Sequence, residues 1–141
     1  MIRVRPATRD DAEHLVPLIR ELGYEQPAEV VAGKLAAAAR SEVDAVLLAV
    51  DDDRIAGLIA CHALETLHIA GRLGRITALV VAASHQRRGV GAMLVDAAET
   101  FFRSAGCRRI EVTSGVRREG AHAFYRAQGY AETSKRFVKS V

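Results

Sequence analysis

The amino-acid sequence predicts a mixed α/β fold with a single domain over residues 1–141, and three features of the chain indicate it. Short apolar segments separated by turns fill much of the first half, which predicts a meander of antiparallel strands. An apolar run at residues 76–81 then gives way, after a short basic loop, to apolar residues at helical spacing. A further strand follows this helix, and a helical crossover makes two such strands parallel. We therefore expect a mixed central sheet with about four helices.

The N-terminal elements are a strand followed by two helices. Apolar and charged residues alternate over residues 2–5, which predicts a half-exposed strand. Thr8 is a typical N-cap, and the apolar face between residues 12 and 22 predicts a helix that Gly23 ends. A second helix is expected over residues 28–40.

The remaining elements alternate in type along the chain. The pattern predicts strands at residues 45–50 and 54–65 around a tight turn, a second turn at 67–74 and a strand at 76–81. The central helix should stop at Gly106, and a parallel strand at 109–113 and a helix at 119–128 should follow. We expect residues 130–138 to supply one or two closing strands, whose edge at residues 136–138 is a candidate homodimer contact.

Composition excludes several classes of protein. The chain has 141 residues, half of them apolar, and no run of ~18 uncharged apolar residues that would cross a membrane. We expect a cytoplasmic protein without a membrane partner. The net charge of +3 is spread along the chain, and only 5% of residues are aromatic, so no stacking platform for nucleic acid is indicated. Cys61 and Cys107 lack metal-ligand spacing, and we expect reduced thiols and no metal site.

Two glycines mark the point where the strand at residues 76–81 passes into the central helix. The sequence there is Gln86-Arg87-Arg88-Gly89-Val90-Gly91. The first N–H groups of a helix lack partners and its amino end is positive, so such a place binds anions when glycines let them approach. Glycines at this point can also serve only to ease packing. A P-loop is excluded because no Gly-Lys-Ser or Gly-Lys-Thr follows, and a dinucleotide fingerprint would need a glycine where Leu94 stands.

A second segment completes a pattern. Together with the glycine loop, Ala121-His122-Ala123-Phe124-Tyr125-Arg126-Ala127-Gln128-Gly129-Tyr130 resembles the GNAT superfamily of acetyl-CoA-dependent N-acetyltransferases. The resemblance implies a GNAT-like sheet whose parallel strands splay at the cofactor site. It also implies acetyl-CoA as co-substrate and an amine acceptor, a small molecule or a protein, that attacks directly through a tetrahedral intermediate.

The resemblance also assigns roles to residues near the splay. Backbone amides of the glycine loop would hold the pyrophosphate of the cofactor; these residues are Arg87, Arg88, Gly89, Val90, Gly91 and Ala92. The main chain of Leu79, Val80 and Val81 would pair with the pantetheine arm as an added strand does. Arg118 stands where many members have an asparagine, and an arginine there could contact a cofactor phosphate or lie on the surface.

Tyr125 matches the tyrosine that the family uses to protonate the departing thiolate, and core packing is the competing interpretation. Many members carry a glutamate on the central strand as general base, whereas this chain has Thr77. Glu65 is the base candidate that we single out. Three further candidates are His62, His68 and Glu111. The missing glutamate motivates a second hypothesis, a CoA-binding regulatory or sensor module that has lost turnover.

Overall fold

The computed structural model describes residues 1–113, 119–133 and 136–141, and its helices and strands follow the predicted order as far as the helix that begins at Glu119. In chain order they are β1 (Ile2–Pro6), a 3-10 turn (Arg9–Asp11), α1 (Ala12–Glu21), α2 (Ala28–Ala39), β2 (Asp44–Asp51), β3 (Arg54–Glu65), β4 (Arg72–Val81), a second 3-10 turn (Ala83–His85), α3 (Val90–Ser104), β5 (Cys107–Val112) and α4 (Glu119–Ala127).

These strands form one five-stranded sheet in the order β1-β2-β3-β4-β5. The first four strands pair antiparallel, and β5 runs parallel to β4. The crossover through α3 explains the parallel pair, since a strand–helix–strand connection returns the chain in the same direction. The prediction of a mixed sheet with four helices is confirmed.

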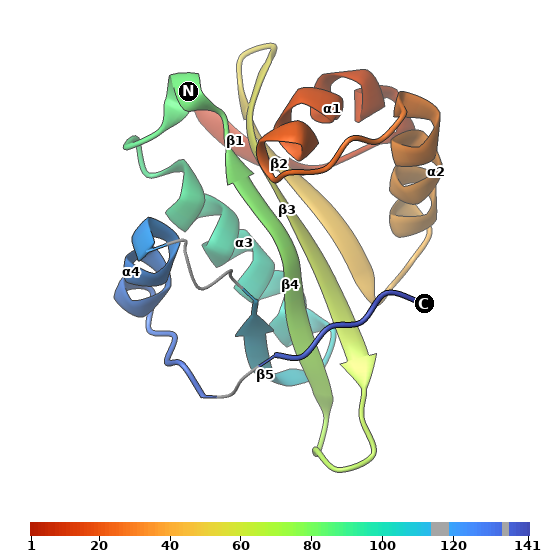
Figure 1. Cartoon of the computed structure of the whole chain (residues 1–141), viewed down its shortest axis with the longest axis vertical. Coiled ribbons are helices and arrows are strands. Elements are labelled where there is room, and N and C mark those ends of the chain that lie inside the picture. Colours follow the sequence, from red (N-terminus) through yellow and green to blue (C-terminus); the bar gives the residue numbers. More distant parts are fainter. Residues whose placement is uncertain (114–118, 134–135) are drawn as a thin grey trace.

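Helices cover both faces of the sheet (Figure 1). On one face α1 and α2 pack over β2 and β3, with Leu15, Leu35 and Leu48 among the buried side chains. On the other face α3 packs through Leu94 and Phe102. Burying a side chain of this size stabilises the fold by roughly 1.5–3 kcal/mol. Central strands buried on both faces read as continuous apolar runs, which explains why they were recognisable in the sequence.

The turn before β4 is shorter than predicted, because the strand begins at Arg72 and includes Gly74. A Cβ atom built on Gly74 would lie 2.7 Å from the ring of Phe102. This glycine therefore allows α3 to approach the sheet closely, whereas the prediction placed it at the end of a turn.

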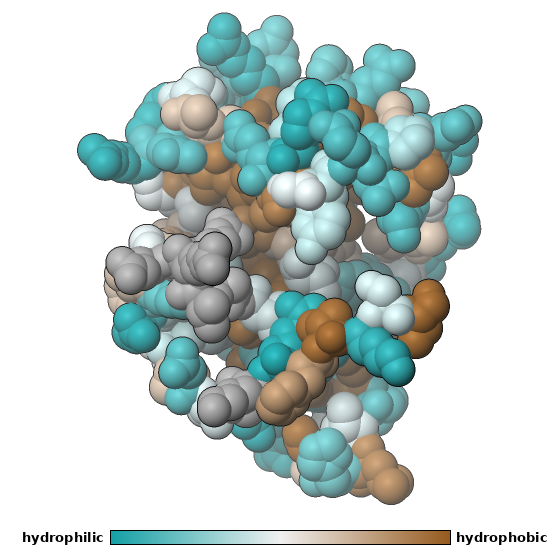
Figure 2. Space-filling model, viewed as in Figure 1, coloured by the Kyte–Doolittle hydropathy of each residue, from teal (hydrophilic) through white to brown (hydrophobic). Residues whose placement is uncertain are grey.

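The predicted closing strands at residues 130–138 are wrong for the residues that the structure describes there. Neither 130–133 nor 136–141 contains a strand, and no described segment pairs with the outer edge of β5. Phe137 and Val138 are 90% and 75% exposed. Figure 2 shows hydrophobic atoms along the path of this segment, on a face that is otherwise mainly hydrophilic. An alternating pattern makes a strand only where a neighbouring strand accepts it, so the expected dimer edge has no strand to form it.

A partly buried ion pair connects β1 to the start of α1. The Arg5 guanidinium donates two hydrogen bonds to Asp11, at 2.9 and 2.8 Å, and the backbone amide of Thr8 donates a third at 2.7 Å. Asp11 is only 8% exposed. Three donors favour the ionised carboxylate, so they lower the pKa of Asp11 to about 2 despite its burial.

We expect Asp11→Asn to lower the free energy of unfolding at pH 7 by about 2 kcal/mol. The pKa of Asp11 is about 2 in the folded protein against an ordinary 3.8, so the stabilisation is complete above about pH 4. It disappears as the pH falls through 2, where wild type and variant should unfold alike. Urea unfolding between pH 7 and pH 2 measures this difference. Asp10→Asn, at an exposed position of the same turn, is the control, and equal losses in the two variants would contradict the assignment.

Candidate active site

The candidate site begins where β4 and β5 separate. Their pairing ends at Ile76 and Val112, although β4 continues to Val81. Residues 78–81 remain paired with β3, so the edge of β4 that faces away from β3 has no strand neighbour among the described residues. Figure 1 shows this upper part of β4 beside the start of α3. Backbone groups on such an edge can pair with a ligand that carries amides, and Leu79, Val80 and Val81 lie along it.

Thr77 lies at the fork between the two strands. Ala60 pairs with Ala78 and Cys61 with Ile76, so Thr77 is the extra residue of a β-bulge and has no partner on β3. Bulges bend a strand and re-aim its side chains, often beside active sites. The side chain of Thr77 is exposed and lines the cavity at the fork.

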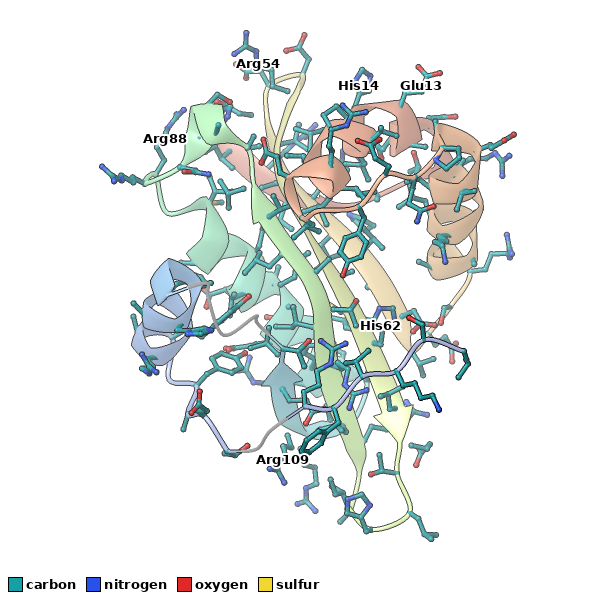
Figure 3. The ribbon with its side chains drawn as sticks, viewed as in Figure 1. Glu13, His14, Arg54, His62, Arg88 and Arg109 are labelled. Carbon is teal, nitrogen blue, oxygen red and sulfur yellow. The ribbon has the colours of Figure 1, made fainter. Side chains whose placement is uncertain are left out.

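This cavity has a volume of about 1360 Å³ and lies at the fork, where Arg75 and Thr77 line it from β4 and residues 78–81 do not. Leu22 and Tyr24, which follow α1, line it on one side of the sheet, and Phe102 of α3 lines it on the other. Arginines outnumber acidic residues in its lining. The charged lining residues are Arg75, Glu99, Arg103, Arg108, Arg109, Glu111, Glu132 and Arg136. Figure 3, viewed as in Figure 1, shows Arg109 below His62.

The loop between β4 and α3 is fixed by a buried histidine. His85 is 3% exposed, and its ring nitrogens lie 2.8 Å from Ser84 Oγ and 3.0 Å from Asp51 Oδ2. The hydrogen bond from His85 lowers the pKa of Asp51. Arg88 also approaches Asp51, at 3.8 Å. His85 was not among the residues singled out in the sequence, where a lone histidine in a polar loop carries no spacing signal.

The two glycines of the loop have different roles. Gly89 is the N-cap of α3 with φ of 78°, a left-handed conformation, and a Cβ there would meet nothing within 4 Å. At Gly91 a Cβ would lie 3.2 Å from the ring of Phe124. Gly89 thus sets the backbone turn and leaves open space above it, whereas Gly91 lets α4 pack on the first turn of α3. Both predicted glycines lie at the amino end of the helix.

Helix α4 carries Tyr125 beside this end of α3. The half-buried Tyr125 ring packs between Phe124 and Tyr130, with ring centroids 5.4 and 6.2 Å away. The hydroxyl of Tyr130 donates to Glu99 of α3 at 3.0 Å, and burial raises the pKa of Tyr130. Tyr130 therefore serves to hold α4 on α3, which positions Tyr125.

The other predicted site residues are dispersed. Glu65 is exposed at the end of β3, where it accepts a hydrogen bond from Arg72 at 3.0 Å, and it does not line the cavity. Glu111 lines the cavity but is paired with Arg75. His62 lies on β3, hydrogen-bonded to Thr77 at the fork. Arg118 lies outside the described residues.

Neither cysteine has the environment of a nucleophile. Burial raises the pKa of the Cys61 thiol to about 12. Burial also raises the pKa of Cys107, although Arg72 opposes this. Both thiols are free, and among the residues that the structure describes no group of three or more His, Cys, Asp or Glu could hold a metal ion. In that same part of the chain no helix is long and apolar enough to cross a membrane.

A mixed sheet with a splayed parallel pair, a glycine-marked helix start beside the splay and a cavity at the fork are the features expected of an N-acetyltransferase. The model of the acetyltransferase (GNAT) family matches residues 10–130, and the chain belongs to this family. The resemblance found in the sequence is thereby confirmed.

Two curated relatives are named as N-acetyltransferases. The aminoalkylphosphonate N-acetyltransferase of Salmonella typhimurium is 33% identical over 94 residues, which are 67% of this chain and 61% of that protein. The match thus spans less than two thirds of that relative. The uncharacterized N-acetyltransferase YhdJ of Bacillus subtilis is 28% identical over 143 residues and covers both chains completely.

Solved structures share the fold at low identity. A transcriptional regulator from Bacillus halodurans has a TM-score of 0.88 at 20% identity, with complete coverage of both chains. Aminoglycoside N-acetyltransferase AAC(6')-Iy in complex with CoA has a TM-score of 0.88 at 17% identity, over 100% of this chain and 95% of that one. Glucosamine-6-phosphate N-acetyltransferase from Arabidopsis thaliana has a TM-score of 0.85 at 16% identity, over 99% of this chain and 98% of that one. These likenesses concern the fold alone.

We expect Gly89→Val to weaken CoA binding at least tenfold, because the new side chain stands over the amides at the start of α3 and strains a left-handed residue. Gly106→Val is the matched control. Gly106 has φ of 79° near the opposite end of α3, and a Cβ there also meets nothing within 4 Å. Both variants should lose similar stability in thermal unfolding, while calorimetric titration with CoA should separate them. Equal CoA affinity in the two folded variants would place the phosphates elsewhere.

Proposed function

We propose that this protein is an acetyl-CoA-dependent N-acetyltransferase that acts in the cytoplasm on a small-molecule amine. One observation carries the proposal: the edge of β4 that has no strand neighbour among the described residues is followed, after the loop at residues 82–89, by the glycine-marked amino end of α3. An extended arm with amide groups fits the first feature and a diphosphate fits the second. The two features follow one another along the chain, so a single ligand that has both groups can occupy them together.

The residues present fit coenzyme A. The main chain of Leu79, Val80 and Val81 would pair with the pantetheine arm, and the amides of residues 87–92 would hold the pyrophosphate. Arg87 and Arg88 are exposed beside those amides and add positive charge to the helix dipole. When bound, the cofactor supplies an activated acetyl thioester, and the protein has to supply a neutral amine and a proton for the thiolate.

Tyr125 is our candidate for the proton donor. A phenol with pKa ~10 stays protonated at neutral pH and can donate to a thiolate within hydrogen-bond reach. Phe124 on Gly91 and Tyr130 on Glu99 fasten the helix that carries it to α3. These contacts support the role because they fix Tyr125 relative to the helix end where the diphosphate would bind.

Direct transfer, without an acyl-enzyme, agrees with the thiol environments. A nucleophilic cysteine acts as its thiolate, and burial disfavours the thiolate at both Cys61 and Cys107. We therefore propose attack of the amine on the thioester through a tetrahedral intermediate.

The charges of the cavity favour an acceptor that carries an anionic group beside its amine. Arg75 and Arg103 are paired with Glu111 and Glu99, but Arg109 has no ion pair with any described residue. Arg108 and Arg136 likewise have none in the part of the chain that the structure describes. A surplus of guanidinium groups suits a phosphonate or carboxylate and repels a polycation. The name of the 33% identical relative, an aminoalkylphosphonate N-acetyltransferase, supports this choice.

We expect thiol release from acetyl-CoA with aminomethylphosphonate and 2-aminoethylphosphonate at rates at least tenfold above those with an aminoglycoside or a lysine peptide. Product mass spectrometry should show one acetyl group on the amine. Arg109→Gln should raise KM for the phosphonate and leave KM for acetyl-CoA unchanged, with Arg54→Gln, on an exposed residue at the start of β3, as control. Tight CoA binding without turnover of any amine would instead support the sensor module.

We expect Tyr125→Phe to lower kcat about 100-fold and to leave the CoA affinity within twofold, because it removes a proton donor and keeps the ring contacts. Tyr130→Phe is the matched control, since its hydroxyl is bonded to Glu99. That variant should unfold at a lower temperature and, because it loosens the helix that carries Tyr125 but keeps the proton donor, should lower kcat by less than tenfold. Single-turnover kinetics and thermal melting measure both effects, and wild-type kcat in Tyr125→Phe would remove this residue from the mechanism.

A further inference from the structure

A continuous chain of hydrogen-bonded side chains runs from β2 across β3 to β4 and ends at the fork between β4 and β5. Asp44 Oδ1 lies 2.9 Å from His62 Nδ1, and His62 Nε2 lies 2.8 Å from Thr77 Oγ1. Behind them Ser41 Oγ donates to Asp44 Oδ2 at 3.0 Å. Asp44 and His62 are direct partners in the β2–β3 register, and the bulge brings Thr77 within reach of the imidazole. The sheet itself therefore aligns the chain.

The chemistry of the partners fixes the direction of each hydrogen bond. An ionised carboxylate only accepts, so the proton of a neutral His62 is on Nδ1 and the lone pair is on Nε2. The hydroxyl of Thr77 then donates to Nε2 and keeps its own lone pairs for a ligand in the cavity. Ser41 Oγ accepts from the amides of Val43 and Asp44, at 3.1 and 3.0 Å, which directs its proton to Asp44.

Building on the proposed acetyl transfer, we infer that His62 accepts the proton of the acceptor amine through the hydroxyl of Thr77, with Asp44 and Ser41 as positioning residues. The ammonium passes one proton to Thr77 Oγ1 as the hydroxyl proton moves to His62 Nε2. The neutral amine then forms the C–N bond, the C–S bond breaks, and the thiolate takes the proton of Tyr125. The second nitrogen proton returns to Tyr125 through solvent, and His62 releases its proton to solvent.

The position of Thr77 makes this relay relevant to the reaction. Thr77 lies at the last point where β4 is still close to β5, so a substrate that enters the splay passes it. The groups around His62 leave the imidazole as the acceptor. Asp44 is the neighbour of His62 on β2. On β4 the register partner of His62 is Arg75, whose guanidinium donates a hydrogen bond to Glu111 of β5. In Figure 3 His62 lies on the viewed face, above Arg109.

A merely structural interpretation accounts for less of the geometry. The side chains of His62 and Asp44 are 36% and 39% exposed, and ion pairs so open to solvent contribute little to stability. A structural role also gives no reason for His62 Nε2 to be hydrogen-bonded to the hydroxyl of Thr77, which lines the cavity.

The first test compares variants in steady-state acetylation of the acceptor that the wild type accepts. We expect His62→Gln to lower kcat at least 100-fold at pH 7 with KM for acetyl-CoA unchanged. The deficit should shrink to less than tenfold as the pH approaches the pKa of the amine, because a neutral amine needs no base. His14→Gln, at an exposed position of α1, is the matched control and should behave as wild type. Wild-type kcat in His62→Gln, or a deficit that is constant with pH, would overturn the inference.

Thr77 supplies a second comparison that stability does not confound. Thr77→Val keeps the shape and removes the hydroxyl, whereas Thr77→Ser keeps the hydroxyl. We expect Val to lower kcat at least tenfold and Ser to stay within threefold of wild type. Equal rates in the two variants would show that the hydroxyl carries no proton.

Nitrogen-15 spectra of histidine-labelled protein test the relay independently of turnover. We expect His62 as the Nδ1–H tautomer, with a changed Nε2 signal in Thr77→Val and loss of the tautomer preference in Asp44→Asn. An Nε2–H tautomer would overturn the relay even in an active enzyme. A wild type that acetylates no amine overturns the proposed function and this inference together, whereas normal turnover by His62→Gln overturns the inference alone.

Discussion

The separation of β4 from β5 after Ile76 is the constraint on which the rest of the site depends. Below that point the pair is held tightly: the ring of Phe102 rests on Gly74, and the amide of Arg72 donates to the carbonyl of Gly106 at 3.0 Å. Above it, among the residues that the structure describes, β4 is paired with β3 alone. Unpaired backbone in the middle of a fold is costly unless water or a ligand satisfies it. A sheet closed at one end and open at the other therefore creates a binding slot whose position is set by packing.

The opposite end of the slot is fixed by contacts between elements far apart in sequence. Asp51, at the end of β2, holds His85 and so determines where the loop turns into α3. Phe124 then lies against Gly91, which places α4 on the same helix turn. The amino end of α3 is thus held to β2 on one side and to α4 on the other. This arrangement fixes the amino end of α3 relative to β2 and α4.

Much of this fold could be predicted from the sequence because its signals are local. Residues 54–65 form β3, and α3 ends at Ser104, two residues before the left-handed Gly106, close to where their pattern indicated. The misassigned parts depended on partners that a local pattern does not reveal. Gly74 looked like a turn residue because the ring of Phe102 that fills its missing side chain is remote in sequence. The Asp44–His62–Thr77 chain was equally hidden, since it requires the β2–β3 register and a bulge.

The splay also explains why the two proton-transfer groups of the proposed reaction come from different parts of the chain. Cys61 packs against α3, so His62, its neighbour on β3, points to the opposite face of the sheet, the face covered by α1 and α2. Tyr125 belongs to α4, which is fastened to α3 on the other face. In the proposed complex the thioester carbonyl would lie in the slot, between the element that carries His62 and the helix that carries Tyr125. In the proposed reaction the amine would lose its proton to a group on one face while the thiolate gains one from a group on the other, so the two transfers need not share one residue.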